Sequence, residues 1–127
     1  MKNTLFILIF FICACTASVK QEDLIGRWNY VSYAYENKSL DKPLANIASQ
    51  KPFIQFFEDG KCRIVSSGKT LSEGTYTLDG KIIRYMEELP DGQTRPVPFL
   101  IKSLSAEELV FQTMDAEVKI ITAKKAK

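Results

Sequence analysis

Short turns between strand-like segments constrain the fold of this chain more than any other feature. Asp-Gly pairs at 59–60 and 79–80, and the sequence "PDGQ" at 90–93, each separate two segments rich in aromatic and β-branched residues. Asp-Gly flanked by alternating hydrophobic residues is a strong β-hairpin signal, because glycine readily adopts the positive φ that tight hairpin turns need. No segment after residue 24 has a convincing helical period, although 42–49 would allow one short turn of helix. We therefore expect an all-β domain.

The spacing of these turns predicts eight strands in one domain. Their expected ranges are 25–35, 52–58, 61–67, 71–78, 81–89, 95–103, 107–113 and 116–123. Every connection is hairpin-short except the link at 36–51, which favours an up-and-down antiparallel meander. Closing such a meander into a barrel removes its exposed edges, whereas a two-sheet sandwich would need more long connections than the chain has. We predict an eight-stranded antiparallel up-and-down β-barrel.

Alternation along each strand predicts which side chains face the interior. The strand at 81–89 is ambiguous, because Ile82 and Ile83 compete and both phases carry charge. Pro96 and Pro98 share one phase and lack N–H donors, which suits a barrel rim, a bulge or an imperfect closure point. The expected inward set is Trp28, Tyr30, Ile54, Phe56, Cys62, Ile64, Tyr76, Leu78, Val97, Phe99, Ile101, Leu109, Phe111, Val118 and Ile120.

The N-terminal segment has a different character. Lys2 and Asn3 precede the uninterrupted apolar run 5–12, and small residues follow it. This pattern is typical of a secretory signal peptide, and the run is well short of the roughly 20 apolar residues that a membrane-spanning helix needs. A buried helix would need periodic polar positions, and the run has none.

The end of this segment indicates where the chain is cut and lipidated. The sequence "ICAC" at 12–15 resembles a lipobox, in which a small residue precedes a cysteine whose sulfur receives fatty-acyl chains. Ala14 before Cys15 fits this pattern, whereas Ile12 before Cys13 does not. We predict a lipoprotein signal peptide at 1–14, a lipidated Cys15 carrying diacylglyceryl and palmitate groups, and a tether at 15–23. The barrel domain would then occupy 24–123, and 124–127 would form a solvated basic tail.

Cysteine and charge content argue against several kinds of site. The chain has no histidine and only three cysteines, so a four-ligand His/Cys metal site cannot be assembled. With Cys13 removed and Cys15 acylated, Cys62 is the one remaining thiol, and we expect it to be a small buried hydrophobe. Loss of Lys2 with the signal leaves 16 basic and 15 acidic residues, which argues against a nucleic-acid partner. We expect no cofactor.

The strand pattern resembles a known family. A first strand that carries Gly26-x-Trp28, a long link and then a series of hairpins is similar to the lipocalin fold, and most similar to the small lipocalin-like domains of bacterial envelope lipoproteins. The matching segments are "LIGRW", "FIQFFEDGKCRI", "GTYTLDGKII" and "LSAEELVF", which together span most of 24–122.

The resemblance implies that Gly26 and Trp28 close one end of the barrel. Larger lipocalins stack an arginine from near the last strand on this tryptophan, and here we find only Lys119 nearby, in an outward phase. The second family motif and a C-terminal helix are missing. The lipid on Cys15 predicts anchoring in the cell envelope, and, by resemblance to how such lipoproteins are commonly routed, Thr16 after it is compatible with sorting to the outer membrane.

Two functions are consistent with this fold. As a binding module, the barrel would enclose a small hydrophobic ligand, which the resemblance implies; an eight-stranded interior holds either its own side chains or one small ligand. As a scaffold lipoprotein with a filled barrel, it would bind a protein partner in the envelope through outward residues Tyr33, Tyr35 and Phe57. The candidate ligand-binding residues are Tyr30, Phe56, Ile64, Tyr76, Phe99 and Phe111, which also belong to the expected core, so pocket and filled core both remain open.

Catalysis has little support in the sequence. Histidine is absent, and no serine lies in a Gly-x-Ser-x-Gly motif. Glu87 and Glu88 lie in an expected strand, where solubility explains them. We expect a protein that is not an enzyme and has no catalytic residues.

Overall fold

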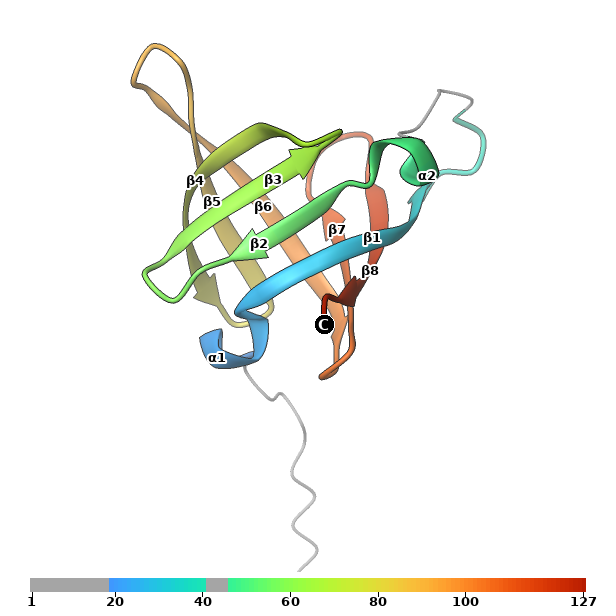
Figure 1. Ribbon diagram of the computed structural model, residues 1–127. Helices are drawn as coiled ribbons and strands as arrows, with labels where there is room; N and C mark the ends of the chain where they lie inside the picture. The colour runs from blue at the N-terminus through green and yellow to red at the C-terminus, as the bar shows by residue number, and fades with distance from the viewer. Residues whose placement is uncertain (1–18, 41–45) are drawn as a thin grey trace, which may run out of the picture.

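A computed structural model describes residues 19–40 and 46–127. The predicted signal peptide and the predicted lipidation site at Cys15 lie outside the described residues. In the described part, eight antiparallel strands pair in chain order, and the last pairs with the first, so the sheet forms a closed barrel (Figure 1). The predicted all-β up-and-down barrel is confirmed. No helix among these residues has the length and apolar character needed to cross a bilayer.

Two short helices accompany the strands. In chain order the elements are α1 (Gln21–Leu24), β1 (Gly26–Tyr35), α2 (Ile47–Gln50), β2 (Phe53–Phe56), β3 (Lys61–Ser66), β4 (Lys69–Asp79), β5 (Ile82–Glu88), β6 (Thr94–Leu104), β7 (Glu108–Thr113) and β8 (Lys119–Lys125).

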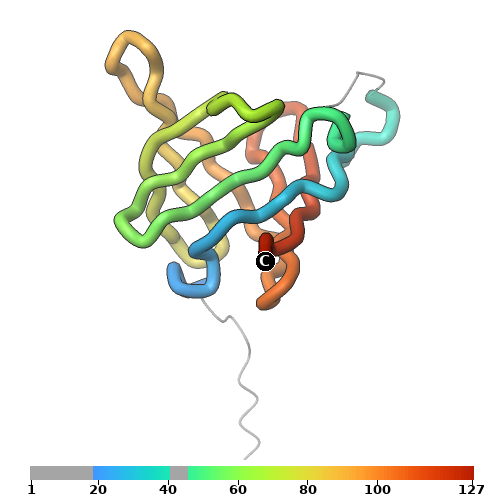
Figure 2. Tube along the Cα trace, in the orientation of Figure 1, coloured from blue at the N-terminus to red at the C-terminus, as the bar shows by residue number. Residues whose placement is uncertain are grey.

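The two ends of the barrel differ, as the chain trace in Figure 2 shows. Because the strands alternate in direction, α1, the C-terminus and the turns after β2, β4 and β6 gather at one end, which we call the closed end. Helix α2 and the turns after β3, β5 and β7 gather at the other, which we call the open end. The β5–β6 hairpin projects beyond the barrel wall at the open end (Figure 1).

A contact between β1 and β8 closes the barrel at the closed end. The Trp28 side chain is fully buried, and its Nε1 donates a hydrogen bond of 2.8 Å to the carbonyl oxygen of Leu24. Lys125 Nζ lies 4.6 Å from the centre of the Trp28 ring and donates to the carbonyl oxygen of Ile25 at 2.5 Å. At Gly26, where φ is +128°, a Cβ would lie 2.6 Å from Lys125 Cε. Glycine therefore leaves the space through which the lysine reaches the indole.

This contact corrects two expectations from the sequence. The cation on the tryptophan is Lys125 and not Lys119, which lies at the opposite end of β8. Residues 124 and 125, expected in a solvated tail, belong to β8, and Ala126 N donates to the carbonyl oxygen of Arg27. The lysine-rich sequence "AKKAK" predicts a solvated tail, but its first three residues form the end of β8 and take part in closing the barrel.

Most of the expected inward residues are confirmed, and the exceptions have identifiable causes. In β8 the buried residues are Ile121 and Ala123, so the expected inward phase of Val118 and Ile120 is wrong. In β3 an irregularity of register after Ile64 buries Val65 and leaves Ile64 partly exposed. In the ambiguous strand, Ile83 and Tyr85 face the core.

A bulge in β1 changes the phase of its second half. The register against β8 shifts between Tyr30 and Ser32, so Val31 has no partner in the ladder. Tyr33 then lies opposite the buried Ile121, in the inward phase. The expected outward phase of Tyr33 and Tyr35 is therefore wrong, because the sequence pattern does not reveal an extra residue in a strand.

The open end of β6 has a free edge. Its pairing with β7 begins at Phe99, whereas its pairing with β5 begins at Thr94. Ile101 N donates to the carbonyl oxygen of Lys81, on the β5 side of β6. By alternation, the nitrogens of Pro96 and Pro98 point to the opposite side, where β7 has already ended. The prolines remove N–H donors that another strand would bind. The expected imperfect closure point is thus present, on the β7 side of β6.

We expect Lys125→Met to lower the free energy of unfolding by about 2 kcal/mol. The variant keeps an apolar stem over Trp28 but loses a hydrogen bond from a charged donor, worth roughly 1.5–3 kcal/mol, and a cation–π contact, worth roughly 0.5–1 kcal/mol. Urea unfolding followed by Trp28 fluorescence measures the change. The matched control is Lys124→Met, because Lys124 pairs with Glu108 on the exposed face and should matter little. Equal losses in both variants would contradict the closing role of Lys125.

Candidate functional site

The open end of the barrel contains an apolar cavity of about 440 Å³. This volume falls in the range of small-molecule sites in proteins, roughly 300–1,000 Å³. Its walls come from six of the eight strands, from α2 and from the links between them, with aromatic and aliphatic side chains inside and polar ones around the rim. The lining residues are Tyr30, Tyr33, Gln50, Pro52, Ile64, Ser66, Ser67, Lys69, Leu71, Phe99, Thr113 and Ile121.

Pro52 lies just before β2, and neither β2 nor β5 adds a side chain to the cavity wall.

Two tyrosines of β1 stand together on one side of the cavity. The bulge after Tyr30 turns Tyr33 inward as well, and the two ring centres lie 6.4 Å apart. Burial raises the pKa of both phenols, and for Tyr33 the neighbouring Tyr35 and Asp115 raise it further. Both hydroxyl groups therefore stay protonated at neutral pH, where each can donate a hydrogen bond to a ligand.

Toward the closed end, the barrel is filled by aromatic side chains. Phe99 meets Phe111 edge-on with ring centres 5.2 Å apart, and Phe56 meets Tyr76 in the same way at 5.0 Å. Such edge-to-face pairs are the favoured geometry of packed aromatic rings. Phe99 thus forms part of the cavity floor, while the other three lie below it and do not line the cavity.

This arrangement divides the six candidate ligand-binding residues into two groups. Tyr30, Ile64 and Phe99 line the cavity. Phe56, Tyr76 and Phe111 are buried in the core. The barrel is therefore packed toward its closed end and hollow toward its open end, so the pocket and the filled core that the sequence left as alternatives coexist. Binding of a ligand remains a prediction.

A chain of polar side chains runs from the inner face of β4 and β5, beside the cavity, to the exposed Arg95 on β6. The hydroxyl oxygens of Ser72 and Tyr85 lie 2.6 Å apart, and Arg95 pairs with Glu87. The hydrogen bond from Ser72, opposed by desolvation and supported by Arg95, lowers the pKa of Glu87. The Tyr85 ring stacks on Phe99 with centres 6.2 Å apart, which connects this chain to the cavity floor.

The sequence did not reveal this polar chain. Glu87 shares the inward phase with Tyr85, and the two phases of this strand could not be separated by hydrophobicity. One residue could have pointed to it: Gly74, which pairs with Glu87. A Cβ at Gly74 would lie 1.9 Å from the carbonyl oxygen of Met86, but this close approach is visible only in the structure. Glycine allows the two strands to approach closely here.

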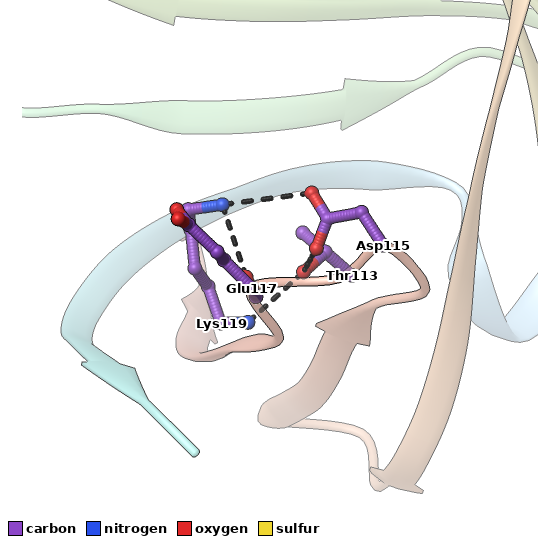
Figure 3. A network of polar contacts seen from close by, with 4 residues as sticks. All are labelled: Thr113, Asp115, Glu117 and Lys119. Carbon is purple, nitrogen blue, oxygen red and sulfur yellow. Dashed lines mark hydrogen bonds and ion pairs between the residues drawn. The ribbon is translucent and has the colours of Figure 1, made fainter. Parts of the chain in front are cut away.

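The turn after β7 is held by a polar network at the cavity rim, which Figure 3 shows. Thr113 Oγ1 donates to Asp115 Oδ1 at 3.0 Å and accepts from Lys119 N at 2.9 Å. Lys119 Nζ donates to the carbonyl oxygen of Glu117 and lies 3.6 Å from Asp115 Oδ2. The same nitrogen lies 5.9 Å from the centre of the Tyr35 ring. The network fixes Thr113 at the edge of the cavity and holds Tyr35 at the open end.

The three residues of the candidate partner surface do not come together. Phe57 follows β2 at the closed end, where Arg63 covers its ring at 5.6 Å. Because Phe56 pairs with Gly26, Phe57 lies near the start of β1, while Tyr35 lies at its end. Nine residues of strand at about 3.3 Å each separate the two positions by roughly 30 Å. Tyr33 lies inside the mouth, so a continuous Tyr33–Tyr35–Phe57 patch is absent from the outer face.

Cys62 is buried, as expected from the sequence, with 1% of its surface exposed. Burial raises the pKa of its thiol to about 12. Within 19–40 and 46–127, no cluster of three or more His, Cys, Asp or Glu side chains is arranged to hold a metal ion.

We expect the Cys62 thiol to be unreactive in the folded protein at pH 8. Thiol reagents attack the thiolate, and a pKa of about 12 leaves very little thiolate at this pH. In a Cys13→Ser/Cys15→Ser variant, a colorimetric thiol assay should show no modification until denaturant is added. The sign follows from the raised pKa: burial of the neutral thiol stabilises the fold below the pKa of the unfolded chain, and this stability is lost as the pH rises toward 12. Rapid labelling at pH 8 without unfolding would contradict the burial of this thiol.

Comparison with known proteins assigns no relative to the chain: no family model matches it, and no curated protein matches it.

Proposed function

We propose that this chain is a binding lipoprotein of the bacterial cell envelope, whose lipocalin-like barrel holds a small hydrophobic ligand at its open end. One observation carries the proposal: the apolar cavity of about 440 Å³ inside the barrel. A hollow half of a closed barrel leaves apolar side chains uncovered, and a ligand would cover them. The resemblance of "LIGRW" and the following hairpins to lipocalin-like lipoproteins supports the same function.

Removal of apolar surface from water would supply most of the affinity. Each square ångström of apolar surface buried contributes roughly 25 cal/mol, and the walls offer aromatic rings such as Phe99 and Tyr30. Polar groups lie toward the rim, among them Ser67, Lys69 and Thr113. The cavity therefore suits a ligand with an apolar body and one polar end that stays near the mouth.

The membrane anchor is the second part of the proposal. Cys15 stands in a lipobox-like sequence behind an apolar run, and Thr16 is compatible with sorting to the outer membrane. A single lipid-bearing residue would attach the barrel to the membrane without any spanning segment.

A scaffold with a filled barrel is the less favoured alternative. The barrel is hollow at its open end, and Tyr35 and Phe57 lie at opposite ends of the molecule. We propose binding rather than catalysis, since the cavity wall is predominantly apolar.

Leu71→Glu should weaken the binding of an apolar fluorescent probe by about tenfold or more. The Leu71 side chain lines the mouth but is 66% exposed, so the change should leave the fold intact. A carboxylate pressed against an apolar ligand loses hydration, and a penalty of about 1.4 kcal/mol already corresponds to a factor of ten in affinity. Fluorescence titration of the purified protein measures the dissociation constant.

The matched control is Val31→Glu, because Val31 is also exposed (49%) but does not line the cavity. Its affinity for the probe should match that of the unaltered protein. Equal weakening by both substitutions, or no probe binding at all, would count against the cavity as a ligand site. Native mass spectrometry after mild extraction with lipids would identify a bound molecule.

Cys15→Ser should abolish acylation and release the protein from membranes, because the other cysteine of the lipobox-like sequence, Cys13, follows Ile12 and not a small residue. Cys13→Ser provides the control, since Cys13 would leave with the signal peptide and its loss should change neither property. Metabolic labelling with a palmitate analogue and membrane fractionation read the two properties separately. Retention of Cys15→Ser on membranes would refute the anchor.

A further inference from the structure

The N-terminal segment of the described chain is fixed to the closed end of the barrel. Leu24 in α1 is fully buried, and its carbonyl oxygen accepts the hydrogen bond from Trp28. Gln21 Nε2 lies 3.2 Å from both the Tyr76 hydroxyl oxygen and the carbonyl oxygen of Glu58, to which it donates. Val19 also packs against the core. From Val19 onward, the chain cannot swing away from this end without breaking these contacts.

The chain between this attachment and the predicted lipid is short. Four residues lead from Cys15 to Val19, which span at most about 14 Å when fully extended. By contrast, β1 runs nine residue steps from Gly26 at the closed end to Tyr35 at the open end, roughly 30 Å. With the strand tilt usual in barrels, about 35–45°, the two ends are still separated by more than 20 Å along the axis. A lipid on Cys15 is therefore too close to the closed end to let the mouth face the same membrane.

We propose that the closed end faces the membrane that carries the lipid on Cys15, and that the cavity opens away from this membrane. The inference rests on the proposed acylation of Cys15. The surface that meets the lipid headgroups comprises α1, the turns at its side and the end of β8 (Figure 1).

The shape and charge of the closed end suit a phospholipid headgroup layer. A groove of about 610 Å³ lies beside α1, between Val19 and the end of β6. It presents carboxylates from Glu22 and Asp23 together with ammonium groups from Lys81 and Lys102. Ammonium groups can pair with the phosphate of a zwitterionic headgroup, and carboxylates can pair with its amine. This surface therefore needs no net positive charge to lie against the headgroups. The lipid, and not charge, would hold the protein on the membrane.

This orientation determines how the cavity is reached. The exposed apolar residues Leu71 and Met114 lie at the open end, where they face the aqueous side and not the anchoring bilayer. A ligand would therefore enter from solution or from a second surface, and not directly from the membrane to which the protein is attached.

Energy transfer to a labelled membrane tests the orientation with the full acylated protein. Single cysteines for a donor dye are introduced by Lys81→Cys in the closed-end turn or by Gln93→Cys in the open-end turn, where both native side chains are exposed. Cys62 is buried and Cys15 would carry lipid, so the dye should attach only to the new thiol. The protein is reconstituted on the outside of phosphatidylethanolamine–phosphatidylglycerol vesicles that carry acceptor-labelled headgroups.

We expect several-fold higher transfer from position 81 than from position 93. Equal transfer from both positions would indicate a barrel lying on its side, and higher transfer from position 93 would indicate a mouth that faces the bilayer; either result overturns the orientation. Flotation of the vesicles and probe binding are measured on the same samples. Protein that floats and binds probe but shows equal transfer defeats the orientation alone, whereas protein that fails to float defeats the anchor and the orientation together.

Discussion

The contact of Lys125 with Trp28 across Gly26 is the constraint on which the rest of the barrel depends. The backbone ladder between β1 and β8 removes the exposed edges that an open up-and-down sheet would have, and this contact secures the ladder at the closed end. The lysine also satisfies the carbonyl oxygen of Ile25, while the indole satisfies that of Leu24. Two backbone acceptors at a buried end of the barrel are thus paired by the same two side chains that close it. Glycine suits position 26 because φ is +128° there, and because a Cβ would displace the lysine from its place over the indole.

Closure at one end explains why the cavity lies at the other. The indole and Leu24 fill the closed end completely, and the aromatic pairs above them continue the packing to Phe99. Toward the open end the wall becomes uneven: β2 has four residues and β7 six, whereas β4 and β6 have eleven each. Long strands beside short ones leave inner faces without a partner across the barrel, and an apolar hollow results. The prolines of β6 protect the longest of these unpaired edges from strand addition.

The strand number and most of the core were predictable, because they depend on local chemistry. Asp-Gly pairs mark the hairpins at Gly60 and Gly80, both of which have positive φ, and two-residue alternation then places Ile54, Tyr76 and Leu109 inside. The errors arise where one residue changes the register. A bulge at Val31 turned Tyr33 from a supposed outer surface into the cavity wall, and β8 contains apolar residues in both phases, so alternation alone could not orient it. The role of Lys125 could not be predicted because it depends on Gly26 and Trp28, almost the whole domain away in sequence.

The division of the barrel into a closed end and an open end also separates stability from binding. Residues 19–24, which include α1, and the end of β8 meet at the closed end, so the interactions that hold the fold together are distant from the cavity. The mouth is formed by α2 and by turns such as 114–118, which the local network of Thr113 and Lys119 holds by its own side chains. Loops that are stabilised locally tolerate substitution better than elements that share a core. Changes at the mouth can therefore alter which ligand fits while the contact between Lys125 and Trp28 continues to keep the barrel closed.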